Sequence, residues 1–314
     1  MTAGSLAAAV DALEARLPGR VERDAASGPL TTYRCGGPLA ALVRIESDDD
    51  LHELAAVLVS HPAVPVLVVG RGSNLLIADA GFAGVGIWLG GAFERIDVDP
   101  ARARVEAGSA AALPVLARQA AKAGIGGLEF FVGIPGSVGG ALRMNAGGHG
   151  AQTRDVIVSA RVLDLRAGPV RELTAEELGL GYRSSALGST DLVVAAVFGG
   201  YEDDPAECAR RIDEIVRWRR EHQPGGQNAG SVFTNPPGDA AGRLIEACGC
   251  KGQRVGGVVV SEKHANFFVA EPGARAGDVL ALVRLVQARV EAQTGVRLVP
   301  ELHLVGFSEG KERG

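Results

Sequence analysis

The stretch Gly70-Arg71-Gly72-Ser73-Asn74-Leu75 follows the apolar run Val64–Val69, and a second glycine-rich stretch begins about sixty residues later at Gly133. The first stretch nearly matches the dinucleotide pattern G-x-G-x-x-G, but Leu75 occupies the last position. No acidic residue lies in the expected context, and an apolar strand-like run follows instead of a helix. The chain also contains no G-K-[ST] loop. The Rossmann and P-loop folds are therefore excluded.

The second stretch is Gly133-Ile134-Pro135-Gly136-Ser137-Val138-Gly139-Gly140. Successive backbone N–H groups in loops of small residues can cradle a phosphate, and Ser73 and Asn74 would add donors to the first loop. Two such loops favour a diphosphate held by backbone groups. At the first loop alone, a plain tight turn is an equally good interpretation.

Composition bounds the class of protein. The chain has 314 residues, 46% of them hydrophobic and 22% charged, which is typical of a globular protein and excludes general disorder. The net charge of −5 argues against a nucleic-acid footprint. Glycine is unusually frequent, with 44 residues, and indicates many tight turns. The 32 basic residues include only four lysines, so an anion site is expected to use Arg or backbone N–H groups.

The cysteines and the apolar runs bear on compartment. Cys248-x-Cys250 has no second cysteine pair or paired histidines near it, so buried thiols are expected and no metal site is predicted. The longest apolar run, Leu192–Phe198, is too short to span a bilayer. No secretory signal is recognised at the N-terminus. We expect a cytoplasmic protein with reduced thiols.

Hydrophobic periodicity predicts mixed helices and strands. Ser47 and Ser109 are expected to cap helices, as is Asp239 for a helix ending at Cys248. Because strands and helices alternate without a strict βαβ rhythm, an α+β fold is favoured. Further helices are predicted at 5–16, 206–221 and 277–293, and strands at 64–69, 85–89, 156–165, 192–198, 255–260, 266–269 and 301–305.

Several segments in a fixed order resemble the UDP-N-acetylenolpyruvoylglucosamine reductase (MurB) family of peptidoglycan synthesis. Together they cover about residues 31 to 306. Besides the two glycine stretches, they are Thr31-Thr32-Tyr33-Arg34-Cys35-Gly36-Gly37-Pro38, Gly127-Leu128-Glu129-Phe130, Met144-Asn145-Ala146-Gly147, Gly181-Tyr182-Arg183-Ser184-Ser185, Ala229-Gly230-Ser231-Val232-Phe233, Asn235-Pro236, Ser261-Glu262-Lys263-His264-Ala265-Asn266-Phe267 and Pro300-Glu301.

The resemblance implies an FAD-binding fold of the vanillyl-alcohol-oxidase (PCMH) type with NADPH as electron donor. It places the flavin region at 1–200, split near 80–90, and an α+β substrate domain at 205–314. No histidine lies between His61 and His149, so FAD is expected to be noncovalent. The implied cofactor-binding residues are Gly70, Arg71, Gly72, Ser73, Asn74, Leu75, Gly133, Ile134, Pro135, Gly136, Ser137, Gly140, Asn145 and Gly147.

The implied reaction reduces the enol ether of UDP-N-acetylglucosamine-enolpyruvate, so negative charge develops beside a carboxylate. Arg183 is always cationic and can fork onto that carboxylate. By resemblance, Ser231 donates the proton and Glu301 assists on the carboxylate side, while Tyr182 and Asn235 contact substrate. The protonation state of Glu301 stays open. Taken without the family pattern, these residues would be interpreted as turn and edge-strand positions.

The sequence departs from the common family pattern at Thr234, at Gln227-Asn228 and at Cys250, which affects the walls of the substrate site. Only 48 positions separate Arg183 from Ser231, which resembles the branch without a longer substrate-covering loop. Two alternatives stay open: another FAD-dependent oxidoreductase of the same superfamily, or a nucleotide-sugar-binding protein without turnover. The sequence does not indicate an oligomeric state.

Overall fold

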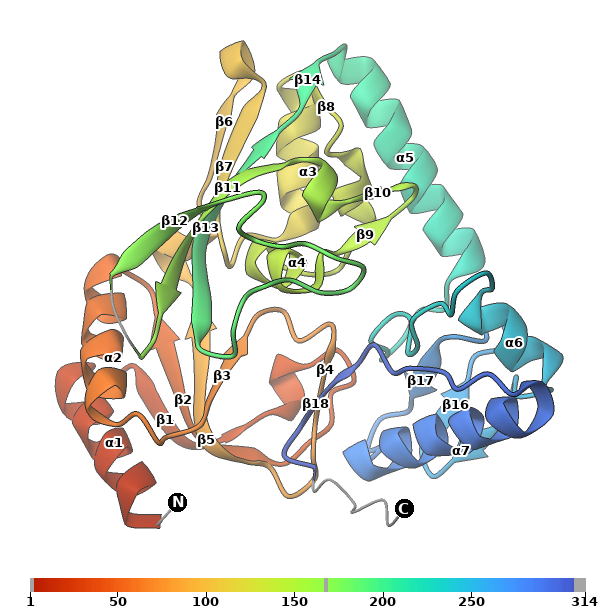
Figure 1. Cartoon of the computed structure of the whole chain (residues 1–314), viewed down its shortest axis with the longest axis horizontal. Coiled ribbons are helices and arrows are strands. Elements are labelled where there is room, and N and C mark those ends of the chain that lie inside the picture. Colours follow the sequence, from red (N-terminus) through yellow and green to blue (C-terminus); the bar gives the residue numbers. More distant parts are fainter. Residues whose placement is uncertain (1–2, 167–168, 308–314) are drawn as a thin grey trace. The chain divides into compact units, whose positions relative to one another are not determined.

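The computed structural model describes residues 3–166 and 169–307 (Figure 1). The chain divides into two compact units. Unit 1 contains the residues up to Arg23, Ala41–Arg71 and Gly84–Arg219, and unit 2 contains Asp24–Ala40, Gly72–Ala83 and the residues from Arg220 on. Unit 2 thus includes two segments from the first half of the chain.

The first sheet of unit 1 has the strand order β1-β2-β5-β3, with β3 and β5 parallel. Helices α1 and α2 pack against this sheet and form one core with it. Helix α2 is capped by Ser47, whose hydroxyl accepts from the Asp50 N–H, as the sequence predicts. The elements are α1 (Ala3–Arg16), β1 (Val21–Ala26), β2 (Pro38–Ile45), α2 (Asp48–Ser60), β3 (Val66–Val69) and β5 (Phe82–Leu89).

The second sheet of unit 1 is antiparallel throughout, in the order β12-β11-β13-β7-β6. Strand β13 has five consecutive buried residues, and the core on this sheet is completed by α3 and α4. The elements are β6 (Ile96–Asp99), β7 (Arg104–Gly108), α3 (Leu113–Lys122), α4 (Val138–Met144), β11 (Ile157–Asp164), β12 (Val170–Thr174) and β13 (Asp191–Gly199).

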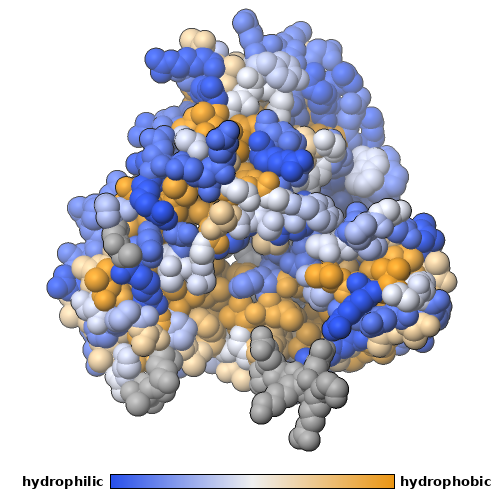
Figure 2. Space-filling view, viewed as in Figure 1, coloured by the Kyte–Doolittle hydropathy of each residue, from blue (hydrophilic) through white to orange (hydrophobic). Residues whose placement is uncertain are grey.

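Short elements complete unit 1 and lead into α5. Helix α5 buries Cys208 and Ile212 and presents a charged surface, which Figure 2 shows as a hydrophilic band. The elements are η1 (Gly28–Leu30), which lies in unit 2, η2 (Gly91–Glu94), η3 (Pro100–Arg102), β8 (Ile125–Gly126), η4 (Glu129–Gly133), β9 (Gly147–Gly148), β10 (Ala151–Gln152), η5 (Thr153–Asp155), β14 (Tyr201–Glu202) and α5 (Pro205–His222).

Unit 2 packs α7 and α6 against a three-stranded antiparallel sheet, in the order β15-β16-β17. A separate parallel pair joins β4 to β18, with Leu75 opposite His303. The elements are β4 (Leu75–Ile77), α6 (Ala241–Ala247), β15 (Arg254–Val255), β16 (Val258–Val260), β17 (Phe268–Ala270), α7 (Ala276–Thr294) and β18 (His303–Val305).

The mixture of helices and mainly antiparallel sheets confirms the predicted α+β class. Two predicted helix starts are wrong. Ser109 lies four residues before α3, whose N-cap is Ala112, and its hydroxyl is buried without a hydrogen-bond partner. The Asp239 carboxylate accepts from the Ala240 N–H, one residue before α6 begins. None of the described helices is long and apolar enough to cross a membrane.

Candidate active site

The two glycine loops meet within unit 1. A Cβ built on Gly70 would lie 2.8 Å from Ser137 Oγ, and one on Gly140 would lie 3.7 Å from the same oxygen. Gly70 and Gly140 are both exposed, whereas Ser137 is buried. The fold therefore brings together the two loops that the sequence predicts to act together, with the Ser137 hydroxyl close to exposed glycine backbone.

The N-terminus of α4 lies in the second loop, but its first N–H groups are used by the protein. Val138 N–H donates to Ala111 O at 3.0 Å, and Gly139 N–H donates to Ser109 O at 2.8 Å. The Ser137 hydroxyl makes no capping hydrogen bond to α4. Because these two N–H groups are occupied, we take the Ser137 hydroxyl, which lies next to Gly70, as the hydrogen-bond donor of the second loop.

Gly72 is required for packing in unit 2. Its φ of +62° is left-handed, and an added Cβ would lie 1.9 Å from Leu30 O. Gly72 O accepts from Thr32 N–H at 3.2 Å. The middle glycine of the first loop thus fastens the loop to the segment before Tyr33, whatever the loop binds.

Asn74 connects the first loop to the last strand of unit 2. Its side-chain amide donates to Glu301 O at 3.0 Å, and its own carbonyl accepts from His303 N–H at 3.0 Å. These bonds extend the β4–β18 pairing by one step toward Glu301. The side chain of Asn74 is therefore positioned to hold the Glu301 backbone.

Ser231 and Glu301 are neighbours within unit 2, although they lie 70 residues apart in sequence. Glu301 N–H donates to the carbonyl of Val232, the residue after Ser231, at 2.7 Å. Both predicted catalytic side chains are half-buried. Asn228 holds the backbone just before Ser231, because its Oδ1 accepts from Gly230 N–H at 3.0 Å.

Asn266 holds this segment from the other side and was not among the predicted site residues. It is 3% exposed, and its amide accepts from Phe233 N–H at 3.0 Å and donates to Phe233 O at 2.8 Å. Its carbonyl accepts from Val232 N–H at 2.8 Å. The sequence indicates Asn266 only as part of the segment 261–267. Its hydrogen-bond partners lie more than thirty positions away, so no local pattern predicts that it holds residues 232–233.

Arg183 lies in unit 1, at the tip of a tight turn. Gly181 and Ser184 close the turn through a pair of backbone hydrogen bonds at 3.1 and 3.4 Å. Arg183 has a left-handed φ of +53°, and its guanidinium lies 5.2 Å from the ring centre of Tyr182, which is 56% exposed. Arg183 Nη2 also donates to Gly147 O at 3.4 Å.

Two predicted ligand contacts make structural hydrogen bonds. The side-chain amide of Asn145 is fully buried and bonds to backbone groups of unit 1. Asn235 Oδ1 accepts from Ala241 N–H at 3.0 Å, and so supplies the helix-start contact that the sequence assigned to Asp239. The remaining predicted cofactor positions are all at least partly exposed: Arg71, Ser73, Leu75, Gly133, Ile134, Pro135, Gly136 and Gly147.

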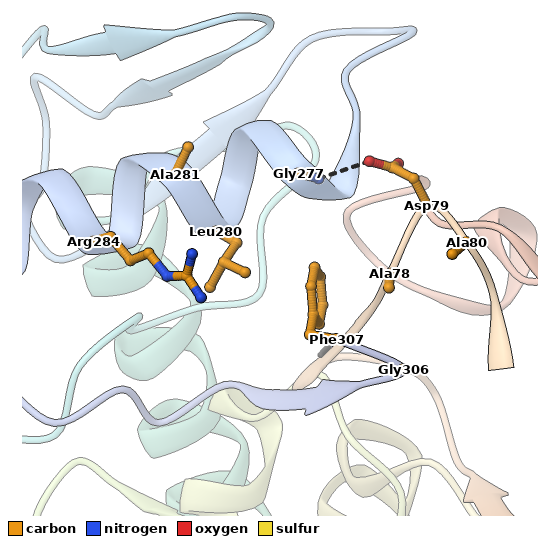
Figure 3. A pocket seen from close by; sticks show the side chains of 9 residues that line it. All are labelled: Ala78, Asp79, Ala80, Gly277, Leu280, Ala281, Arg284, Gly306 and Phe307. Carbon is orange, nitrogen blue, oxygen red and sulfur yellow. Dashed lines mark hydrogen bonds between the residues drawn. The ribbon is translucent and has the colours of Figure 1, made fainter. Parts of the chain in front are cut away.

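A cavity of about 360 Å³ in unit 2 contains none of the predicted residues (Figure 3). Phe307, Leu280 and Arg284 lie along it. At its edge the Asp79 carboxylate accepts from Ala276 and Gly277 N–H, both at 2.9 Å, so the start of α7 is already capped.

One cluster of metal-type side chains occurs in the described ranges: Glu129, Asp203 and Cys208. Arg211 donates to Glu129 Oε1 at 2.7 Å and also to Asp203, so both carboxylates already pair with a cation of the protein. Burial raises the pKa of the Cys208 thiol. All four cysteines are free and buried.

Comparison with known proteins first defines the class. The family model described as "FAD binding domain" matches residues 38–174, and the model described as "UDP-N-acetylenolpyruvoylglucosamine reductase, C-terminal domain" matches residues 222–305. The chain is thus a flavoprotein with the expected vanillyl-alcohol-oxidase-type fold. It belongs to the UDP-N-acetylenolpyruvoylglucosamine reductase family.

The relatives support this assignment along nearly the whole chain. The reductase of Paramagnetospirillum magneticum is 44% identical, covering 93% of this chain and 94% of that protein, and that of Caulobacter sp. is 44% identical, covering 92% and 95%. The crystal structure of the Thermus caldophilus reductase superposes with a TM-score of 0.80 at 37% identity, covering 91% of this chain and 99% of that one.

Proposed function

We propose that this chain reduces the enolpyruvyl group of UDP-N-acetylglucosamine-enolpyruvate to the lactyl ether of UDP-N-acetylmuramate, using FAD and NADPH. The observation that carries the proposal is similarity over more than nine-tenths of the chain to reductases of that name. The similarity favours this reaction over that of another FAD-dependent oxidoreductase of the superfamily. It also argues against a nucleotide-sugar-binding protein without turnover. We further propose that the reaction takes place in the cytoplasm.

The residues of unit 1 fit the diphosphate of FAD. Gly70 and Gly140 leave exposed backbone near the Ser137 hydroxyl, and the Gly70 position has no room for a Cβ beside that oxygen. We assign the diphosphate to this place. FAD, when bound, supplies hydride transfer from NADPH to the terminal vinyl carbon of the substrate.

Arg183 is assigned to the substrate carboxylate. An arginine guanidinium is a planar cation that can donate two parallel hydrogen bonds to a carboxylate. As negative charge spreads from the carbon next to the ether into the carboxylate, this cation stabilises it most in the transition state. Tyr182, stacked near the guanidinium, is assigned to the same subsite.

Ser231 is assigned as the acid that delivers a proton to carbon, and Glu301 as its neighbour on the substrate side. The Glu301–Val232 and Asn74–Glu301 hydrogen bonds hold the two backbones in place, as does Asn266 on the other side. A serine hydroxyl is a weak acid, so it needs surroundings that stabilise the alkoxide or return a proton.

The reaction is tested by NADPH oxidation with and without the enolpyruvyl nucleotide sugar. We expect rapid oxidation only when the sugar is present, and formation of the lactyl ether. Rapid oxidation with oxygen alone, or with an unrelated alcohol or sugar, would favour the alternative oxidoreductase. A yellow protein without turnover of the sugar would favour the binding protein.

The role of Ser231 is tested by separating the half-reactions. Ser231→Ala removes one hydroxyl, so we expect NADPH to bleach the flavin absorbance at the parent rate. Reoxidation by the enolpyruvyl substrate under anaerobic conditions should slow by about 10²–10⁴-fold. Slow bleaching with normal reoxidation would instead make Ser231 a nicotinamide contact.

A further inference from the structure

The end of α4 holds the segment that carries Arg183. The Arg143 guanidinium donates to Leu187 O and Gly188 O at 2.8 Å and to Asp191 O at 2.9 Å. Ser185 Oγ donates back to Arg143 O at 2.9 Å. Residues 185–191 are therefore fastened to one helix end by four hydrogen bonds.

Asn145, two residues later, holds the turn itself. Its Nδ2 donates to Gly181 O at 2.8 Å, while its Oδ1 accepts from Arg154 N–H at 2.9 Å. The side chain is 0% exposed. Because the two bonds fix which end of the amide faces Gly181, the donor toward the turn cannot be replaced by an acceptor.

The turn needs such support, since Arg183 has a backbone conformation that L-residues rarely adopt. A left-handed backbone conformation is unfavourable for a non-glycine residue and persists only where its surroundings determine it. Here Gly181 O accepts from both Ser184 N–H and the Asn145 amide. Asn145 therefore acts on the residue where the turn closes, two positions from Arg183.

Helix α4 also begins directly after Ser137, its N-cap residue, in the loop assigned to the diphosphate. Its seven residues span about 10 Å at 1.5 Å per residue. We propose that α4 fixes the position of Arg183 relative to the cofactor loop, and that Asn145 and Arg143 are positioning residues for the Arg183 turn. This inference rests on the proposed function of Arg183 in binding the substrate carboxylate.

The test uses two variants of the holoenzyme. Asn145→Asp keeps an acceptor for Arg154 N–H but loses the donor to Gly181 O, and Asn145→Gly removes the amide where φ is already +41°. We expect FAD affinity and flavin reduction by NADPH within about threefold of the parent. Reoxidation by substrate should slow by about 10- to 100-fold, as a small misplacement of a positioning group does.

A matched control is Thr153→Val. It deletes a buried hydrogen bond of 2.9 Å from the Thr153 hydroxyl to the carbonyl of Ala146, the residue after Asn145, and leaves the bonds of the 181–184 turn in place. We expect it to lower the melting temperature and to leave reoxidation unchanged. If both Asn145 variants fail to fold, Arg143→Lys, which keeps one donor in place of the fork, and Ser185→Ala carry the same expectation.

A double-variant comparison separates positioning from general stability. If Asn145 acts through Arg183, Asn145→Asp should slow reoxidation in the parent but add little in the Arg183→Ala background. Equal effects in both backgrounds would overturn the inference, as would loss of FAD from both Asn145 variants. If Arg183→Ala itself leaves reoxidation unchanged, the proposed function of Arg183 fails first, which is a distinct result.

Discussion

Gly70 offers a direct test of the cofactor loop. Its backbone conformation is not left-handed, so alanine causes no torsional strain there. The added Cβ would nevertheless lie 2.8 Å from Ser137 Oγ, closer than real Cβ contacts come. The Ser137 side chain must therefore turn away in Gly70→Ala, and its hydroxyl leaves the space between the two loops.

The magnitude follows from the bond that is lost. A hydrogen bond to a charged group contributes about 1.5–3 kcal/mol, and each 1.4 kcal/mol is tenfold in affinity. We therefore expect the FAD dissociation constant of Gly70→Ala to rise by about 10- to 100-fold. The apoprotein should keep its melting temperature, because only the end of one short side chain moves.

Titration of the apoprotein with FAD, followed by flavin fluorescence, measures this effect. Gly225→Ala is the control, since a Cβ there meets nothing within 4 Å. In the Ser137→Ala background, Gly70→Ala should cost little further affinity. Parent-like FAD affinity in Gly70→Ala, or an equal loss in both backgrounds, would refute the assignment of the diphosphate to this place.

Three further predictions concern charge. Arg183→Lys should lower kcat/KM for the nucleotide sugar by about tenfold or more, because the fork onto the carboxylate is lost, while stopped-flow reduction by NADPH stays normal. Arg211→Met leaves the buried Glu129 carboxylate without its cation and should cost about 3 kcal/mol in urea unfolding; an unchanged midpoint would contradict this. The Arg243 guanidinium and the Ala240 N–H lower the pKa of Asp239 to about 2. The ionised Asp239 carboxylate therefore stabilises the folded state, fully above about pH 4, and this contribution is lost as pH falls through 2. Carboxyl NMR titration should show that low pKa, and its return toward the ordinary value in Arg243→Gln.

The class of this protein is predictable from its amino-acid sequence. The two glycine loops excluded the common dinucleotide folds through local chemistry, and the ordered motifs indicated the family. Helix α2 was also predictable, because its cap at Ser47 depends on residues three positions apart. The loops and the cap involve residues close together in sequence, and the family pattern needs only the order of its motifs along the chain.

The roles of individual side chains depend instead on contacts that form when the chain folds. Gly72 must be glycine because Leu30 O lies where a Cβ would be, and Asn145 bonds to Gly181, 36 positions away. The polar side chains of Asn145 and Asn235 are equally able to bind a ligand or a backbone group, and residue type does not distinguish these uses. Their partners are set by chain packing across long sequence separations, which no local pattern contains.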